Sequence, residues 1–416
     1  MKIKTISSLF FLKATLLILL IAAISIPEKN LYAQTSNAIK PAAVMIVPEV
    51  ELKGNGYEKG LQHGKALKKE IAEVYAKWKL NIHNSIKRDP DSVLSDFLKA
   101  TNFEPVTRKY TPEILDELKG ISEGSGQKYD DVFAFQLVDE FWVYIDKLSN
   151  TKNHHCSGIG VPSTANHPAY IAQNMDLENY MNGYQVLLHI AATKKEPEQY
   201  VLTCAGLVGM NGMNGKGIGV CVNTLMELQA STDGLPVAFI IRGILNKENG
   251  REAISFLKTV KHASGQNYIV GIVDSVYDFE ASANQVIRFL PKGKQNSIVY
   301  HTNHALTNHD VKEWYKEYHQ NILANDNMDN NSEIRYASLK QHLNKQPDEI
   351  STDVIKSTLR SKDNKLNPVC RVYKEGGGGF TFSSVVFTLG NIRSVQLTYG
   401  SPDQSEYKEY FFETKK

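Results

Sequence analysis

The stretch His154-His155-Cys156-Ser157-Gly158 stands where the sequence changes character. Before it, apolar residues recur at helical spacing among Lys and Glu residues. After it, short apolar runs are separated by Gly, Asn and Pro, a pattern typical of strands joined by turns. A cysteine at this boundary raises a specific question. If the chain is cut before Cys156, the new α-amino group lies beside the thiol and can take its proton.

Residues 34–155 are predicted to be mostly helical. Apolar residues at helical spacing indicate helices over 57–86, 90–100, 111–121 and 130–142, after a short strand within 44–53. Thr111 followed by Pro112 is typical of a helix start, because proline is tolerated at the first helical position.

Residues 156–416 are predicted to contain two sheets with helical layers outside them. Strands are expected over 169–172, 174–176, 184–191, 199–207, 217–223, 268–274, 276–281, 285–289, 381–389 and 394–399. Helices are expected over 236–245, 251–260, 332–342 and 350–359. The fold class is therefore α+β.

The first 33 residues have the features of a secretory signal peptide. A basic start at Met1 to Lys4 precedes an apolar run from Ala14 to Ile26, and Ala33 is the small residue at the expected cleavage point. The apolar run is shorter than the ~20 residues that cross a bilayer. We expect an exported protein, periplasmic or secreted, without stable membrane association once residues 1–33 are removed; an uncleaved anchor is the alternative.

Composition narrows the class of partner. The 47 basic and 45 acidic residues nearly cancel and form no long run of one sign, which argues against a nucleic-acid partner. The glycines between 206 and 219 lack the Gly-Lys-Ser/Thr ending of a phosphate loop, and no cofactor is expected.

Cys204 and Cys221 lie in apolar segments where buried free thiols are common. If a disulfide forms, this pair is favoured.

Five residues are candidates for chemistry. The Cys156 thiol, with an ordinary pKa of about 8.5, needs a base or a positive charge to become a thiolate. Asp176 follows about one hairpin later and could hold an ammonium group, and Arg335 near a helix start could depress the thiol pKa or bind a carboxylate. Asn223 and Asn303 end apolar strands and offer amide donors to an oxyanion. Each alone has an ordinary structural role as the alternative.

The ordered set resembles a known family. The order Cys, Asn-x-Asp, Gly-x-Gly-Val-x-x-Asn, His-Thr-Asn-His, Ser-x-x-Arg is similar to the acyl-coenzyme A:6-aminopenicillanic acid acyltransferase group of N-terminal nucleophile hydrolases, peptidase family C45. It resembles more distantly the penicillin V acylase and bile salt hydrolase group. The resemblance covers about residues 45–412. Its outer parts are Gly56 to Gly64, Tyr129 to Val132, Asp139 to Phe141, Ser383 to Val386 and Tyr399 to Pro402.

The resemblance implies a four-layer αββα sandwich of two stacked, mainly antiparallel sheets behind a helical N-terminal segment. It also implies roles. Cys156 would be the nucleophile, freed by autoproteolysis between His155 and Cys156, and Asp176 would position its amine. Asn223 and Asn303 would line the oxyanion site, with Arg335 beside the thiol. The substrate would be a small acyl amide, an N-acyl amino acid or a peptide, and the acyl group would pass to water or an amine.

Three positions depart from the patterns of the related groups. Gln173 stands where the bile salt hydrolase branch carries Arg, which favours the penicillin acyltransferase branch. His155 stands where the acyltransferase has Gly, and Ser157 where Thr is usual. Cys-Ser also resembles the phospholipase B-like relatives, so a lipid amide or ester hydrolase is an alternative.

Two further alternatives come from other classes. His154, His155, His301 and His304, with the thiol, offer ligands acceptable to zinc, although adjacent His-His-Cys is poor spacing for convergent ligands. A non-catalytic binding domain on an enzyme scaffold is the other. For an enzyme, specificity is expected in the loops 178–184 and 226–236, whose Tyr, Met, Leu and Asn residues indicate a partly apolar acyl pocket. The sequence gives no indication of oligomeric state.

Overall fold

A computed structural model of the chain describes residues 45–146, 156–291, 297–324 and 331–412. The first of these ranges contains one strand and seven helices: β1 Glu49–Leu52, α1 Gly56–Ala66, α2 Lys68–Ile86, α3 Pro90–Lys99, α4 Phe103–Tyr110, α5 Pro112–Ser125, α6 Tyr129–Phe135 and α7 Val138–Asp146. The helical character predicted for this part of the chain is therefore confirmed. Two of the predicted helices are each divided in two, and α4 was not predicted.

Helix boundaries follow local signals. Asn55 and Glu58 form a capping box at the start of α1, and Asp89 accepts the N–H of Ser92 at the start of α3, with proline at its first position. Helix α5 ends at Gly126, whose φ of 77° lies in the left-handed region. These side chains satisfy backbone groups that a helix end leaves without partners.

The rest of the described chain alternates between sheets and helices. The strands are β2 Ser157–Val161, β3 Tyr170–Leu177, β4 Gln185–Ile190, β5 Gln199–Cys204, β6 Asn211–Asn214, β7 Gly219–Thr224, β8 Gln266–Gly271, β9 Val276–Ala281, β10 Val286–Phe289, β11 Val299–His301, β12 Phe380–Thr388, β13 Ser394–Leu397 and β14 Lys408–Phe411. The helices are α8 Val237–Leu245, α9 Gly250–Thr259, α10 Glu313–Ala324, α11 Asn331–His342 and α12 Thr352–Leu359. Strands β2, β6 and β14 and helix α10 were not predicted.

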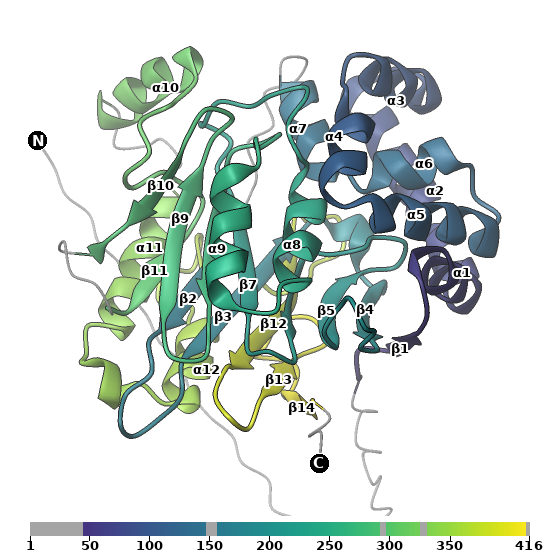
Figure 1. Cartoon of the computed structure of the whole chain (residues 1–416). Coiled ribbons are helices and arrows are strands. Elements are labelled where there is room, and N and C mark those ends of the chain that lie inside the picture. Colours follow the sequence, from purple (N-terminus) through teal and green to yellow (C-terminus); the bar gives the residue numbers. More distant parts are fainter. Residues whose placement is uncertain (1–44, 147–155, 292–296, 325–330, 413–416) are drawn as a thin grey trace, which may run out of the picture. The chain divides into compact units, whose positions relative to one another are not determined.

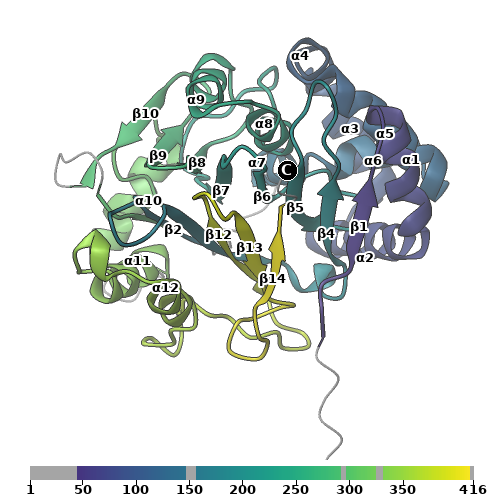
Figure 2. The same ribbon diagram turned by 60° about the horizontal axis from the view of Figure 1, so that its bottom comes forward.

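The strands form two sheets (Figures 1 and 2). The larger has the order β1-β4-β5-β6-β7-β8-β9-β10 and the smaller the order β11-β2-β3-β12-β13-β14. Pairing between neighbouring strands is antiparallel except for β1 with β4. Strand β1 comes from the helical N-terminal part and forms an edge of the larger sheet, so this part and the rest of residues 44–416 form one compact unit.

Three apolar clusters show how the layers stack. One cluster joins the outer face of the larger sheet to helices α8 and α9, and includes Val220, Val270 and Ile240. A second lies between the sheets, and a third joins the smaller sheet to α11 and α12. Helices therefore cover both outer faces of the paired sheets, and the predicted four-layer αββα architecture is confirmed (Figure 1).

The layer between the sheets changes from apolar to polar along the strands. Successive strand residues point to opposite faces, and on the inward faces an apolar residue is followed by a polar one closer to Cys156. Cys221 is followed on its face by Asn223, Ile171 by Gln173, and Val299 by His301. The polar ends of several strands therefore meet at one end of the sandwich.

Helices α1 and α5 pack with their backbones almost in contact. Gly60 faces the backbone of Glu117, where an added Cβ atom would overlap the carbonyl oxygen. A Cβ atom on Gly64 would lie 2.6 Å from the carbonyl oxygen of Ile121, and one on Gly124 would lie 2.6 Å from that of Leu61. The glycines at four-residue spacing are therefore a packing surface.

Gly60→Ala is expected to lower the free energy of unfolding by about 1–3 kcal/mol, the usual cost of overpacking. The sign of this change distinguishes close packing from an ordinary helix interior, where alanine is more stable than glycine by about 1 kcal/mol. Thermal denaturation followed by circular dichroism measures it. Gly378→Ala, in a loop with open space around it, is the control and should leave the midpoint unchanged. A more stable Gly60→Ala variant would contradict the close packing.

No helix among the described residues is long and apolar enough to cross a membrane. The predicted signal peptide lies outside the described residues and stays a prediction. All four cysteines are buried and free, so the buried thiols predicted at Cys204 and Cys221 are confirmed.

Candidate active site

Cys156 lies immediately before β2 and is 7% exposed. Its Sγ atom is 3.6 Å from Sδ of Met175 and 3.8 Å from the carbonyl oxygen of Asp176. Burial and the nearby Asp176 carboxylate raise the pKa of the thiol to about 12, and the charge of Arg335 only partly opposes them. Arg335 lowers the pKa of the thiol, as expected, but the net pKa is still raised. In the uncut chain the thiol is therefore protonated at pH 7.

Asp176 lies beside Cys156 because β2 and β3 are antiparallel. Ser157 pairs with Asn174, and continuing this register brings Met175 and Asp176 to the Cys156 end of β2. Both carboxyl oxygens of Asp176 are buried and accept no hydrogen bond of ordinary geometry from the described part of the chain. Burial raises the pKa of this carboxyl to about 7, although Arg371, the Thr381 hydroxyl and Arg335 oppose the shift. The charges of Arg371 and Arg335 therefore offset the burial of this acid only in part.

Arg335 contacts two of the other predicted site residues, Cys156 and Asn303. It is fully buried on α11, and its Nη1 atom donates to the carbonyl oxygen of Cys156 at 2.6 Å and to Oγ of Ser157 at 3.0 Å. Its Nη2 atom donates to Oδ1 of Asn303 at 3.0 Å. The guanidinium therefore ties the strand that begins at Cys156 to the segment that carries Asn303.

Both the backbone and the side chain of Asn303 are hydrogen-bonded to neighbouring residues. Its Nδ2 atom donates to the carbonyl oxygen of Thr224 at 3.0 Å, and its backbone N–H donates to Oγ of Ser332 at 2.7 Å. The His304 ring also lies against Ser332, with Nδ1 to Oγ at 2.8 Å. An amide NH2 group has two donors. The described residues give Nδ2 of Asn303 one acceptor, so its second N–H has no acceptor among them.

Asn223 belongs to a chain of buried amides between the sheets. Gln173 on β3 donates to its Oδ1 atom at 3.3 Å, and its own Nδ2 atom donates to Oδ1 of Asn267 at 2.9 Å. Asn267 in turn donates to the Asp278 carboxylate. A Cβ atom on Gly158 would lie 3.1 Å from Nδ2 of Asn223. The small residue two places after Cys156 therefore lets the amide approach this strand.

The structure thus brings Cys156, Asp176, Asn303 and Arg335 to one end of the sandwich, with Asn223 against the same strand. The sequence analysis gave no role to four residues that support the site: Thr224, Asp139, Ser332 and Glu280. Asp139 on α7 accepts from Oγ1 of Thr224 at 2.9 Å and so supports the residue whose carbonyl holds Asn303. The acids at alternate positions in β9 were the available signal for Glu280.

The zinc alternative gains no support from the described residues, among which no group of three or more His, Cys, Asp or Glu side chains could hold a metal ion. Both ring nitrogens of His301 already face other partners, Nε2 towards Glu280 at 2.9 Å and Nδ1 towards the carbonyl oxygen of Thr302 at 2.8 Å. His154 and His155 lie outside the described residues.

Comparison with known proteins assigns the class. The family model for acyl-coenzyme A:6-aminopenicillanic acid acyl-transferase matches residues 163–404, more than half of the chain, and the chain belongs to this family of acyl-transferring enzymes. One relative is the 40 kDa form of acyl-coenzyme A:6-aminopenicillanic-acid-acyltransferase from Emericella nidulans. It is 25% identical over 361 residues, which cover 86% of this chain and 94% of the relative. The resemblance drawn from the sequence is confirmed.

Three solved structures are among those that match this chain at low sequence identity. An N-acylethanolamine-hydrolyzing acid amidase ortholog from Caenorhabditis elegans has a TM-score of 0.36 at 16% identity and covers 56% of this chain and 93% of its own. A mutant conjugated bile acid hydrolase from Clostridium perfringens has a TM-score of 0.38 at 11% identity, covering 62% and 97%. Penicillin V acylase from Agrobacterium tumefaciens has a TM-score of 0.34 at 13% identity, covering 59% and 83%.

Proposed function

We propose that this chain is an exported cysteine amide hydrolase of the N-terminal nucleophile type, active after a cut between His155 and Cys156. The observation that carries the proposal is the buried Asp176 carboxylate, which has no hydrogen-bond partner of ordinary geometry among the described residues and lies beside Cys156. A buried carboxylate without a partner is costly. An ammonium group on Cys156, created by the cut, would add a further positive charge and supply the missing donors.

The same amine would activate the thiol. A buried thiol with a pKa of about 12 is a poor nucleophile at pH 7, whereas a free α-amino group has an ordinary pKa of about 7.7–8.0. The neutral amine takes the thiol proton, and the thiolate attacks the substrate carbonyl carbon. The resulting ammonium then returns a proton to the leaving amine, and a thioester on Cys156 remains.

The oxyanion formed in this attack needs donors. Asn303 offers its second Nδ2 hydrogen, and Asn223 offers another from the amide chain between the sheets. Water then attacks the thioester, which releases the acid and restores the thiol. An amine acceptor in place of water gives acyl transfer by the same route.

The substrate proposed is a small acyl amide, an N-acyl amino acid or a peptide with a partly apolar acyl group. Residues 229–232, within the loop predicted to set specificity, line a cavity of about 350 Å³ together with Phe97, Phe103, Tyr144 and Trp314. None of the five candidate site residues lines this cavity, so its use as the acyl pocket is part of the proposal. This volume is within the range of small-molecule sites. Export rests on the sequence of residues 1–33, and the enzyme would meet this substrate outside the cytoplasm.

Trapping the acyl-enzyme tests the chemistry. The purified protein is incubated with acyl amides, N-acyl amino acids, penicillin V and small peptides, quenched in acid and digested. The expected result is an acyl adduct on the peptide that begins at Cys156, formed only with substrates that are turned over. Turnover that proceeds without this adduct and survives thiol alkylation would overturn the proposal.

Asn303→Ala is expected to lower kcat by about 10²–10³-fold, the usual cost of one oxyanion donor. Steady-state kinetics on the best substrate from that panel measures it. Asn249→Ala is the matched control, since Asn249 caps α9 and its loss should cost stability, about 1 kcal/mol, without changing kcat. Equal kcat values for Asn303→Ala and the parent would remove Asn303 from the oxyanion site.

A further inference from the structure

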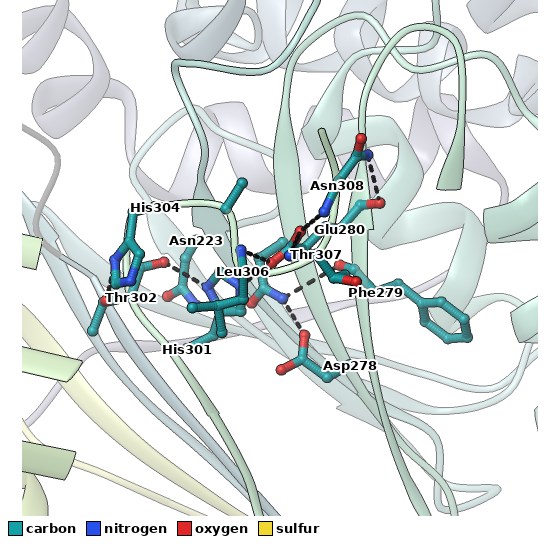
Figure 3. Close-up of polar contacts among 12 residues, drawn as sticks. Asn223, Asp278, Phe279, Glu280, His301, Thr302, His304, Leu306, Thr307 and Asn308 are labelled. Carbon is teal, nitrogen blue, oxygen red and sulfur yellow. Dashed lines mark hydrogen bonds and ion pairs between the residues drawn. The ribbon is translucent and has the colours of Figure 1, made fainter. Parts of the chain in front are cut away.

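One buried carboxylate ties both ends of the segment that carries Asn303 to strand β9 (Figure 3). Glu280 is fully buried. Its oxygens accept from Nε2 of His301 at 2.9 Å and from the backbone N–H groups of Leu306 at 2.5 Å, Thr307 at 2.9 Å and Asn308 at 2.6 Å. His301 precedes the segment, and the three amides end it. A single side chain therefore closes the segment into a loop.

The His301 ring bonds both to Glu280 and to the start of the segment that carries Asn303. Its Nδ1 atom is 2.8 Å from the carbonyl oxygen of Thr302, while Nε2 faces the Glu280 carboxylate. Both partners are acceptors, and a neutral imidazole has only one N–H. Both hydrogen bonds therefore form together only when His301 is an imidazolium.

The electrostatic surroundings favour that charge. Burial alone lowers the pKa of His301, but the charges of Asp278 and Glu280 and the hydrogen bond to Glu280 outweigh it and raise the pKa to about 9. Glu227 from the loop after β7 also interacts with the charges of Glu280 and His301, and Tyr336 from α11 interacts with those of Asp278 and Glu280. A raised folded-state pKa means that the cation persists through neutral pH and is lost as the pH passes about 9.

Asn303 lies between the two tied ends, with Arg335 on one side and Thr224 on the other. We propose that Glu280 and an imidazolium His301 form a buried clamp that positions Asn303, and through it Arg335, beside Cys156. The inference rests on the proposed function, because it treats Asn303 as the oxyanion donor. Glu280 and His301 are positioning residues and do not touch the substrate.

Nuclear magnetic resonance of protein with ¹⁵N-labelled histidine tests the charge state directly. At pH 7.5 both ring nitrogens of His301 should give protonated signals, which disappear in His301→Gln and change to the neutral pattern above pH about 9. Glu280→Gln assigns the His301 signals a second time, because loss of the carboxylate should make the His301 ring neutral at pH 7.5. A His301 ring with one unprotonated nitrogen at pH 7.5 in the parent overturns the clamp.

A double-mutant cycle tests whether the clamp acts through Asn303. With a 4-nitrophenyl acyl ester as the probe, Glu280→Gln should slow nitrophenolate release at least 10-fold with KM changed less than 2-fold. In the Asn303→Ala background the same substitution should change the rate less than 2-fold, since residues that act as a unit are not additive. Equal fold-losses in both backgrounds overturn the positioning role.

Glu117→Gln is the matched control, because Glu117 is also fully buried and forms two 2.9 Å bonds to Arg242. It should lower thermal stability, and any effect on the rate should be equal in both backgrounds. A parent protein that releases no nitrophenolate would count against the proposed function, while the histidine signals would still decide the charge state of the clamp.

Discussion

Replacing Cys156 with alanine is expected to leave the chain uncut and to abolish turnover entirely. The two losses have one cause, because the same thiol would attack the carbonyl of residue 155 during the cut and the substrate carbonyl afterwards. Denaturing electrophoresis would show one band at the size of the full chain, and no substrate that the parent cleaves would be consumed. The residual rate should not exceed background.

Cys204→Ala is the control for this experiment. Cys204 is a buried thiol in the apolar cluster beneath the larger sheet, so its replacement should cost some stability but leave the cut and the activity intact. A Cys156→Ala protein that is still cut before residue 156 would show that another group performs the cut. A Cys156→Ala protein that retains turnover would exclude Cys156 as the nucleophile.

Asp176→Asn is expected to change stability and activity in opposite directions. In the uncut Cys156→Ala background, the parent carboxyl has a pKa of about 7 in the folded chain and about 3.9 when unfolded. The folded chain therefore binds more protons between these values, and stability falls as the pH rises from 4 to 7. The difference corresponds to on the order of 4 kcal/mol, which the neutral amide would largely recover at pH 8.

In the cut enzyme the same substitution should lower kcat by about 10²–10⁴-fold, because loss of an orienting carboxylate misplaces the base. Thermal denaturation at pH 4, 6 and 8 and steady-state kinetics measure the two effects. Glu117→Gln should change the stability in the opposite direction to Asp176→Asn. The Glu117 carboxylate is paired with Arg242, and its loss should destabilise the protein. An Asp176→Asn variant that is less stable at pH 8 and fully active would refute the role of Asp176.

Much of the fold could be predicted because its signals are local. Apolar residues at helical spacing and the Thr111-Pro112 helix start are properties of a few neighbouring residues. The elements missed have weaker signals: β2 begins Ser-Gly-Ile-Gly and β6 reads Asn-Gly-Met-Asn, with few of the β-branched and aromatic residues that mark strands. Both strands exist because sheet neighbours and burial override weak propensity.

The candidate site could be predicted only in part, and for a physical reason. Cys156, Asn303 and Arg335 carry chemically distinctive groups, so their types and order point to a reaction. Glu280 acts through three backbone amides and a histidine ring that the fold brings together, and no spacing in the sequence reveals such a contact. The net rise in the pKa of Cys156 likewise follows from burial, which depends on the packed structure.

The mass of the purified protein tests the central claim most directly. Freshly expressed protein should give two fragments under denaturing conditions, the larger beginning with Cys156 and carrying a free α-amine, while Cys156→Ala gives one intact chain. An active preparation in which the chain runs unbroken through His155 and Cys156 would contradict the proposal that Cys156 becomes a nucleophile by gaining its own amine.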